Sequence, residues 1–206
     1  MKDIRIWLFS LFALFVFSIG VNAGEIHEAA QTGDVEKVRR LLDKNPKLLY
    51  VQDEQGKTPM HWATGKGQLE VMKLLLDVYK VDVDVRNKNG GTPLHVAASQ
   101  AQPEGAKILI RHNAAINARA KSGATPLHFA AFKRRPGHLE VAKILLENKA
   151  DVNAKMDNGA TPLAMASFSN NTAMINLLRQ HGAEGQSGQR RPSGRRRDFG
   201  QMYREW

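Results

Sequence analysis

The sequence predicts an all-α solenoid of about five stacked helix–turn–helix repeats joined by β-hairpin loops. The clearest sign is a Thr-Pro pair that recurs with spacings of 34, 33 and 36 residues, at Thr58, Thr92, Thr125 and Thr161. After each pair come small residues, a turn, a Leu- and Ile-rich segment and usually a relative of Asp-Val-Asn-Ala. One helix pair buries too little apolar surface to offset its own ordering entropy, so the repeats must stack in order to fold.

Each repeat is expected to begin with a short helix that its threonine caps. Threonine accepts hydrogen bonds from the first backbone N–H groups, and proline suits the first helical position because that position needs no N–H. The pairs Ala97–Ala98 and Ala130–Ala131 keep this first helix thin. Neighbouring repeats can therefore pack closely.

A turn and a second helix should follow in each repeat. Gly33, Gly67 and Gly137 fall in the turn, where a positive φ is expected. The third repeat has Ala101 at this position and Pro103 soon after it, so we expect its turn to be reshaped. Apolar residues at helical spacing predict the core face of the second helices; they are Val71, Leu74 and Leu75, then Val141, Ile144 and Leu145, then Ile175, Leu177 and Leu178.

The first and last units are less regular. The segment IHEAAQTGDVEKVRRLL at 26–42 lacks the Thr-Pro start, and the last unit has Ala164 where the others have histidine, which we interpret as a C-terminal cap. On TPLHVAA, TPLHFAA, GHLEVAKILLENKADVNA and the 33-residue period, the chain resembles the ankyrin-repeat family, as a small exported bacterial member. The resemblance covers 24–184, as repeats of about 24–57, 58–91, 92–124, 125–160 and 161–184.

Residues 1–23 have the layout of a signal peptide. Lys2 and Arg5 precede an apolar run over 6–21, and Val21-Asn22-Ala23 predicts cleavage before Gly24. A helix over that run reaches about 24 Å, short of the roughly 30 Å hydrocarbon core of a membrane. We expect export to the periplasm of a Gram-negative bacterium; an uncleaved inner-membrane tether and secretion are the alternatives.

Composition and motifs give no support for catalysis. Hydrophobic content is 42%, charged content is 24% and cysteine is absent, which excludes disulfides, cysteine-ligated zinc and thiol catalysis. The sequence contains no glycine-rich phosphate loop, nucleophile elbow or EF-hand loop. We therefore expect a protein that is not an enzyme and that uses no cofactor.

Three histidines recur in register, at His61, His95 and His128. The resemblance implies that each one hydrogen-bonds its threonine and a neighbouring loop. A shared metal would need ligands at about 2.0–2.1 Å, whereas the repeat stacking implied by the resemblance places equivalent atoms about 10 Å apart. We expect a structural role and no metal site.

The resemblance implies a concave groove, formed by hairpin tips and the exposed ends of the first helices, that binds another protein. Basic residues at the tips would steer an acidic partner, unless they are ordinary solvated charges. Aromatic residues at the helix ends would anchor that partner, unless Phe132 only packs under its own insertion. The candidate partner-binding residues are Arg86, Lys88, Arg119, Lys121, Phe132, Lys133, Arg134, Arg135, Lys155 and Phe168.

Two expectations follow for these candidates. Reversing the charges of Arg86, Lys88, Arg119 and Lys121 together should weaken partner capture and leave thermal stability nearly unchanged. The segment FKRRPGH is three residues longer than its counterparts, so we expect a longer turn at the edge of the groove. Deletion of 133–135 should then spare folding, whether the insertion contacts the partner or is only a tolerated loop.

The C-terminal segment 185–206 differs from the repeats in composition. It carries six arginines against two acidic residues and few aliphatic ones, which predicts a disordered basic tail. With a net charge of +10 for the chain, the alternative function is binding to a polyanion or an anionic membrane surface through this tail. Export disfavours nucleic acid as the partner, and we expect a monomer.

Overall fold

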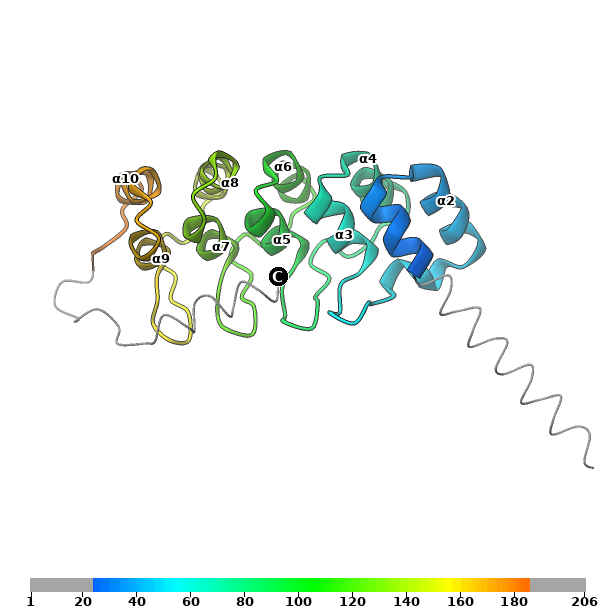
Figure 1. The fold of residues 1–206 in the computed structure, drawn as a ribbon, viewed down its shortest axis with the longest axis horizontal. Coiled ribbons are helices and arrows are strands. Elements are labelled where there is room, and N and C mark those ends of the chain that lie inside the picture. Colours follow the sequence, from blue (N-terminus) through cyan, green and yellow to red (C-terminus); the bar gives the residue numbers. More distant parts are fainter. Residues whose placement is uncertain (1–23, 186–206) are drawn as a thin grey trace, which may run out of the picture.

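The computed structural model describes residues 24–185, and it shows helix pairs stacked side by side in a single row (Figure 1). The predicted signal peptide, 1–23, and residues 186–206 of the predicted tail lie outside the described residues. In the first repeat, a helix over 24–32 precedes α2 (Val35–Lys44) and the 3-10 helix η1 (Pro46–Tyr50). Between residues 24 and 185 no helix is both long and apolar enough to cross a membrane.

The remaining repeats form two layers of helices (Figure 1). The first helices are α3 (Pro59–Lys66), α5 (Pro93–Gln100), α7 (Pro126–Phe132) and α9 (Pro162–Phe168). The second helices are α4 (Leu69–Lys73) with η2 (Leu74–Val78), α6 (Pro103–Arg111), α8 (Pro136–Glu147) and α10 (Thr172–Gln180). Loops over 51–57, 84–91, 117–124 and 153–160 join the repeats, and no strand is assigned within the described range.

The core runs through every repeat, which confirms the predicted helical solenoid. Ala97, Ala98, Ala130 and Ala131 are fully buried between neighbouring first helices, as their small size predicts. The predicted apolar positions of the second helices are also buried or packed against the core. In the second repeat, the longer 34-residue spacing coincides with the π-helical turn η2, which accommodates an extra residue without interrupting the helix.

The recurring histidines close the starts of three first helices, which confirms their structural role. The backbone N–H groups of Thr58, Thr92 and Thr125 donate to the histidine Nδ1 atoms at 3.2, 3.1 and 3.1 Å. Each Nε2 lies 3.1 Å from a carbonyl oxygen of the next repeat's loop, at Gly91, Ala124 and Ala160. Because Nδ1 accepts from an amide, the proton resides on Nε2.

Four turns between helices each contain one left-handed residue, which in the fifth repeat is Asn170 with a φ of 51°. Gly33 and Gly67 have φ of 85° and 69°, as predicted. Ala101 takes the same conformation at 58°, so the expectation of a reshaped third turn is wrong. The left-handed conformation costs an alanine about 1 kcal/mol, which tertiary packing offsets here.

The exception is the fourth repeat, where the insertion mainly lengthens a helix. Lys133 after α7 is extended, with φ −93° and ψ 154°, and α8 has 12 residues where α6 and α10 have 9. Most of the extra length thus adds a turn to the start of α8. The loop 133–135 is only one residue longer than 101–102, so the expectation that all three extra residues lengthen the loop is wrong. Gly137 lies in that added turn without a positive φ; a Cβ there would stand 3.0 Å from both Cβ and O of Ala101.

Candidate protein-binding face

The arginines at the loop tips bind the backbone of neighbouring repeats. Arg86 Nη1 donates to Gly90 O at 2.7 Å and to Arg119 O at 2.8 Å. One repeat further, Arg119 Nη1 donates to Lys155 O at 2.8 Å, and one repeat earlier Gln52 Nε2 donates to Arg86 O at 3.2 Å. These three side chains form a loop ladder that ties four consecutive loops together.

Other tip charges are also engaged. Lys88 Nζ donates to Glu54 O at 2.6 Å, and Arg119 Nη2 pairs with Asp157 at 2.9 Å. Lys121 and Lys155 are exposed. Charge reversal at the tips would break the loop ladder, so we correct the expectation that it leaves stability unchanged. Partner binding by Arg86, Lys88, Arg119, Lys121 and Lys155 stays a prediction.

Lys57, near the tip of the first loop, is only 9% exposed. Its ammonium lies 5.0 Å above the ring of Trp62, and burial lowers its pKa. The indole nitrogen of Trp62 donates to Asp53 at 2.9 Å. Lys57 and Trp62 line a pocket of about 220 Å³ between α3 and α5. We did not anticipate Trp62, although it occupies the helix position that Phe129 occupies in α7 and could have been found from that register.

The predicted aromatic anchors form a pair. Phe132 and Phe168 end α7 and α9, and their rings stack with centroids 6.1 Å apart and an interplanar angle of 16°. Phe132 is half-buried against the core, whereas Phe168 is 44% exposed. The aromatic pair therefore bridges two repeats, with Phe168 the more exposed of the two rings.

The insertion side chains stand beside the aromatic pair. Lys133 is half-buried: its Nζ donates to Ser99 O at 3.0 Å, and its own carbonyl accepts from Asn171 at 3.1 Å. Because Lys133 links α5 to the fifth repeat, we correct the expectation that its deletion spares folding. Arg134 and Arg135 are exposed.

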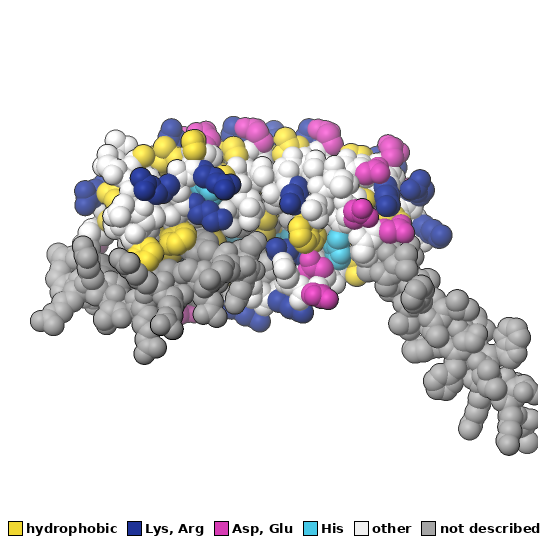
Figure 2. Space-filling view, in the orientation of Figure 1, with side chains coloured by type: hydrophobic (Ala, Val, Ile, Leu, Met, Phe, Trp, Pro, Cys, Tyr) yellow, Lys and Arg dark blue, Asp and Glu magenta, His cyan; other side chains and the backbone are white. Residues whose placement is uncertain are grey.

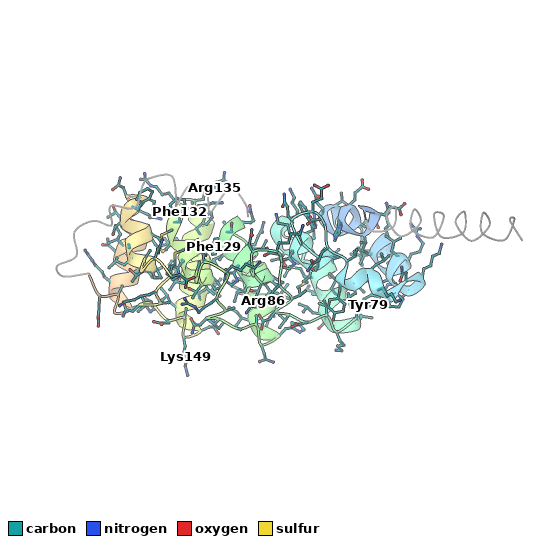
Figure 3. The ribbon with its side chains drawn as sticks, turned by 90° about the horizontal axis from the view of Figure 1, so that it is seen from below. Tyr79, Arg86, Phe129, Phe132, Arg135 and Lys149 are labelled. Carbon is teal, nitrogen blue, oxygen red and sulfur yellow. The ribbon has the colours of Figure 1, made fainter. Side chains whose placement is uncertain are left out.

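The aromatic pair and the insertion lie on one side of the molecule. Figure 3 places Phe132 and Arg135 at one long edge and Tyr79 and Lys149 at the opposite edge. On the visible face in Figure 2, Lys and Arg side chains surround a histidine patch over α7 and α8, above an apolar patch near α9. An apolar contact beside concentrated positive charge suits a partner that carries both apolar and acidic groups.

Comparison with known families agrees with this architecture. A family model for ankyrin repeats, in three copies, matches residues 26–120, 66–156 and 117–189. The chain belongs to the ankyrin-repeat family. Ankyrin repeats are generally protein–protein interaction modules and typically non-catalytic. No curated protein matches the chain. Within residues 24–185, no three His, Asp or Glu side chains cluster closely enough to hold a metal ion.

Proposed function

We propose that this chain is an exported, non-catalytic protein that binds a protein partner through the face where α7 and α9 end. The observation that carries the proposal is the aromatic pair standing beside the basic insertion, 133–135. Aromatic rings supply large contact area at low entropic cost, and arginines add directional hydrogen bonds to acidic groups. The partner therefore presents an apolar side chain next to carboxylates.

Affinity capture from a periplasmic extract tests this proposal. We expect the immobilised chain to retain a defined protein, and Phe168→Ala to weaken its retention by about 10- to 30-fold, the effect of losing a binding hot spot. Val78→Ala is the matched control, because Val78 is 55% exposed but lies in η2 of the other helix layer. Equal retention by wild type and Phe168→Ala would refute the proposal.

Salt separates this proposal from binding through the tail. Capture anchored by the aromatic pair should survive about 0.5 M salt, whereas binding through the arginines of 186–206 should be lost as the Debye length falls well below 10 Å. Truncation after Glu184 should accordingly leave capture intact. A truncated chain that captures nothing would favour the tail instead.

Export rests on the proposed removal of 1–23. N-terminal sequencing of the mature protein should return Gly24 as its first residue. A mature chain that retains the apolar run would instead indicate a membrane tether.

A further inference from the structure

The insertion forms one wall of a second pocket. This insertion pocket has a volume of about 460 Å³ and opens between the end of α5 and the start of α8. Among residues 24–185, those that line it include no acidic side chain, and three are the basic side chains of the insertion; they are Ser99, Gln100, Lys133, Arg134, Arg135 and His138. The pocket between α3 and α5 differs because an acidic residue, Asp53, hydrogen-bonds Trp62 of its lining.

Two buried polar atoms at this pocket lack a partner. Ser99 and His138 are each 1% exposed, and neither Ser99 Oγ nor His138 Nδ1 makes a hydrogen bond. An unpaired buried polar atom is costly, so such atoms indicate a missing ligand or water. Gln68 and Gln102 occupy the position of His138 in the second and third repeats, and each donates a hydrogen bond to a backbone carbonyl of the preceding repeat. His138 makes the same bond, from Nε2 to Ser99 O at 3.1 Å, but its second ring nitrogen is left unpaired, which is specific to the fourth repeat.

Positive charge converges on the same place. Lys133, Arg134 and Arg135 are consecutive, and the 12-residue helix α8 begins at Pro136, so its positive dipole end adds to theirs. Burial, and then the nearby Arg135, lower the pKa of Lys133, consistent with a positive potential that no acidic side chain of the pocket offsets. The pocket thus combines concentrated cations with one unpaired buried donor, the hydroxyl of Ser99.

We propose that the insertion pocket binds a tetrahedral oxyanion of the phosphate class, as free phosphate or as a small phosphomonoester. Donors reach the pocket from three elements: the hydroxyl of Ser99 on α5, the cations of the insertion, and the start of α8. A tetrahedral anion uses donors from several directions, whereas a planar carboxylate uses one plane. The hydroxyl of Ser99 makes no other hydrogen bond, so it can donate to the anion. The site does not depend on a protein partner.

Calorimetric titration of the purified full chain with inorganic phosphate tests the proposal, with ionic strength held constant by sodium chloride. We expect saturable 1:1 binding to wild type. The double variant Arg134→Gln/Arg135→Gln should bind at least about tenfold more weakly. Lys121→Gln/Lys155→Gln removes the same charge from exposed loop positions and should change the affinity less than about twofold.

A third variant tests the buried hydroxyl. Ser99→Ala should weaken phosphate binding by about tenfold without unfolding the chain, because alanine fits wherever serine does. Circular dichroism of each variant checks the fold. Absence of saturable phosphate binding to wild type, or equal loss in the two charge-matched double variants, would overturn the proposal.

Vesicles containing phosphatidic acid distinguish the source of the anion. Release of vesicle-bound chain by free phosphate would support a lipid headgroup as the natural donor of the same oxyanion. Binding of free phosphate with no retention on vesicles would support a small soluble ligand. Retention on vesicles without any binding of free phosphate would overturn the assignment of this pocket.

Discussion

Mild acid should destabilise this protein through its three capping histidines. Burial is the main cause that lowers the pKa of His61, His95 and His128 to about 4. In the unfolded chain each has an ordinary pKa of about 6.5. The unfolded state therefore binds more protons between pH 6.5 and 4, so the stabilisation is complete above about pH 6.5 and is lost as pH falls towards 4.

The size of the effect follows from these pKa values. Lowering the pH from 7 to 5 should remove about 2 kcal/mol of unfolding free energy per histidine, and between about 5 and 6 kcal/mol for all three. Urea unfolding monitored by circular dichroism at the two pH values measures the loss. His95→Gln should lose about 2 kcal/mol less than wild type between pH 7 and 5, whereas the exposed His181→Gln should lose as much as wild type. Equal losses in wild type and His95→Gln would refute the reasoning.

Two further predictions concern contacts between repeats. Arg86→Gln should lower the unfolding free energy by about 1–2 kcal/mol because it removes two hydrogen bonds of the loop ladder. The control Lys121→Gln should change the unfolding free energy by less than about 0.5 kcal/mol. Equal effects of the two substitutions in urea unfolding would contradict the role of the loop ladder. Gly137→Ala should cost about 1–2 kcal/mol through contact with Ala101, and adding Ala101→Gly should restore part of it. An exposed glycine within a helix is normally stabilised by replacement with alanine. If Gly137→Ala stabilised the protein, the third and fourth repeats would not approach as closely at Ala101 and Gly137 as the structure shows.

The helices were predictable from the sequence because their signals are local. Thr-Pro pairs mark the helix starts, and apolar residues at helical spacing mark the buried face, with no knowledge of the neighbouring repeat. The left-handed Ala101 escaped prediction because its own preference opposes that conformation and only packing decides it.

The candidate site was less predictable because its contacts cross between repeats. The sequence suggests that Arg86 and Arg119 are solvated surface charges. Their acceptors are backbone carbonyls of the next repeat, and any residue type can provide a backbone carbonyl, so the sequence does not identify these bonds. The insertion was misjudged for a related reason: Pro136 suits the first position of a helix as well as a loop, and here it begins α8 one turn early. The pairing of Phe132 with Phe168 depends on how closely adjacent repeats stack, which neither repeat encodes alone.

The most direct test of the protein-binding face is photo-crosslinking in living cells. A benzoylphenylalanine placed at Phe168 should yield a discrete adduct of higher mass after irradiation, because this ring stands at the proposed contact. The same group at Val78, in the other helix layer, should yield none. Absence of an adduct at position 168, or equal adducts at both positions, would contradict the proposed binding face.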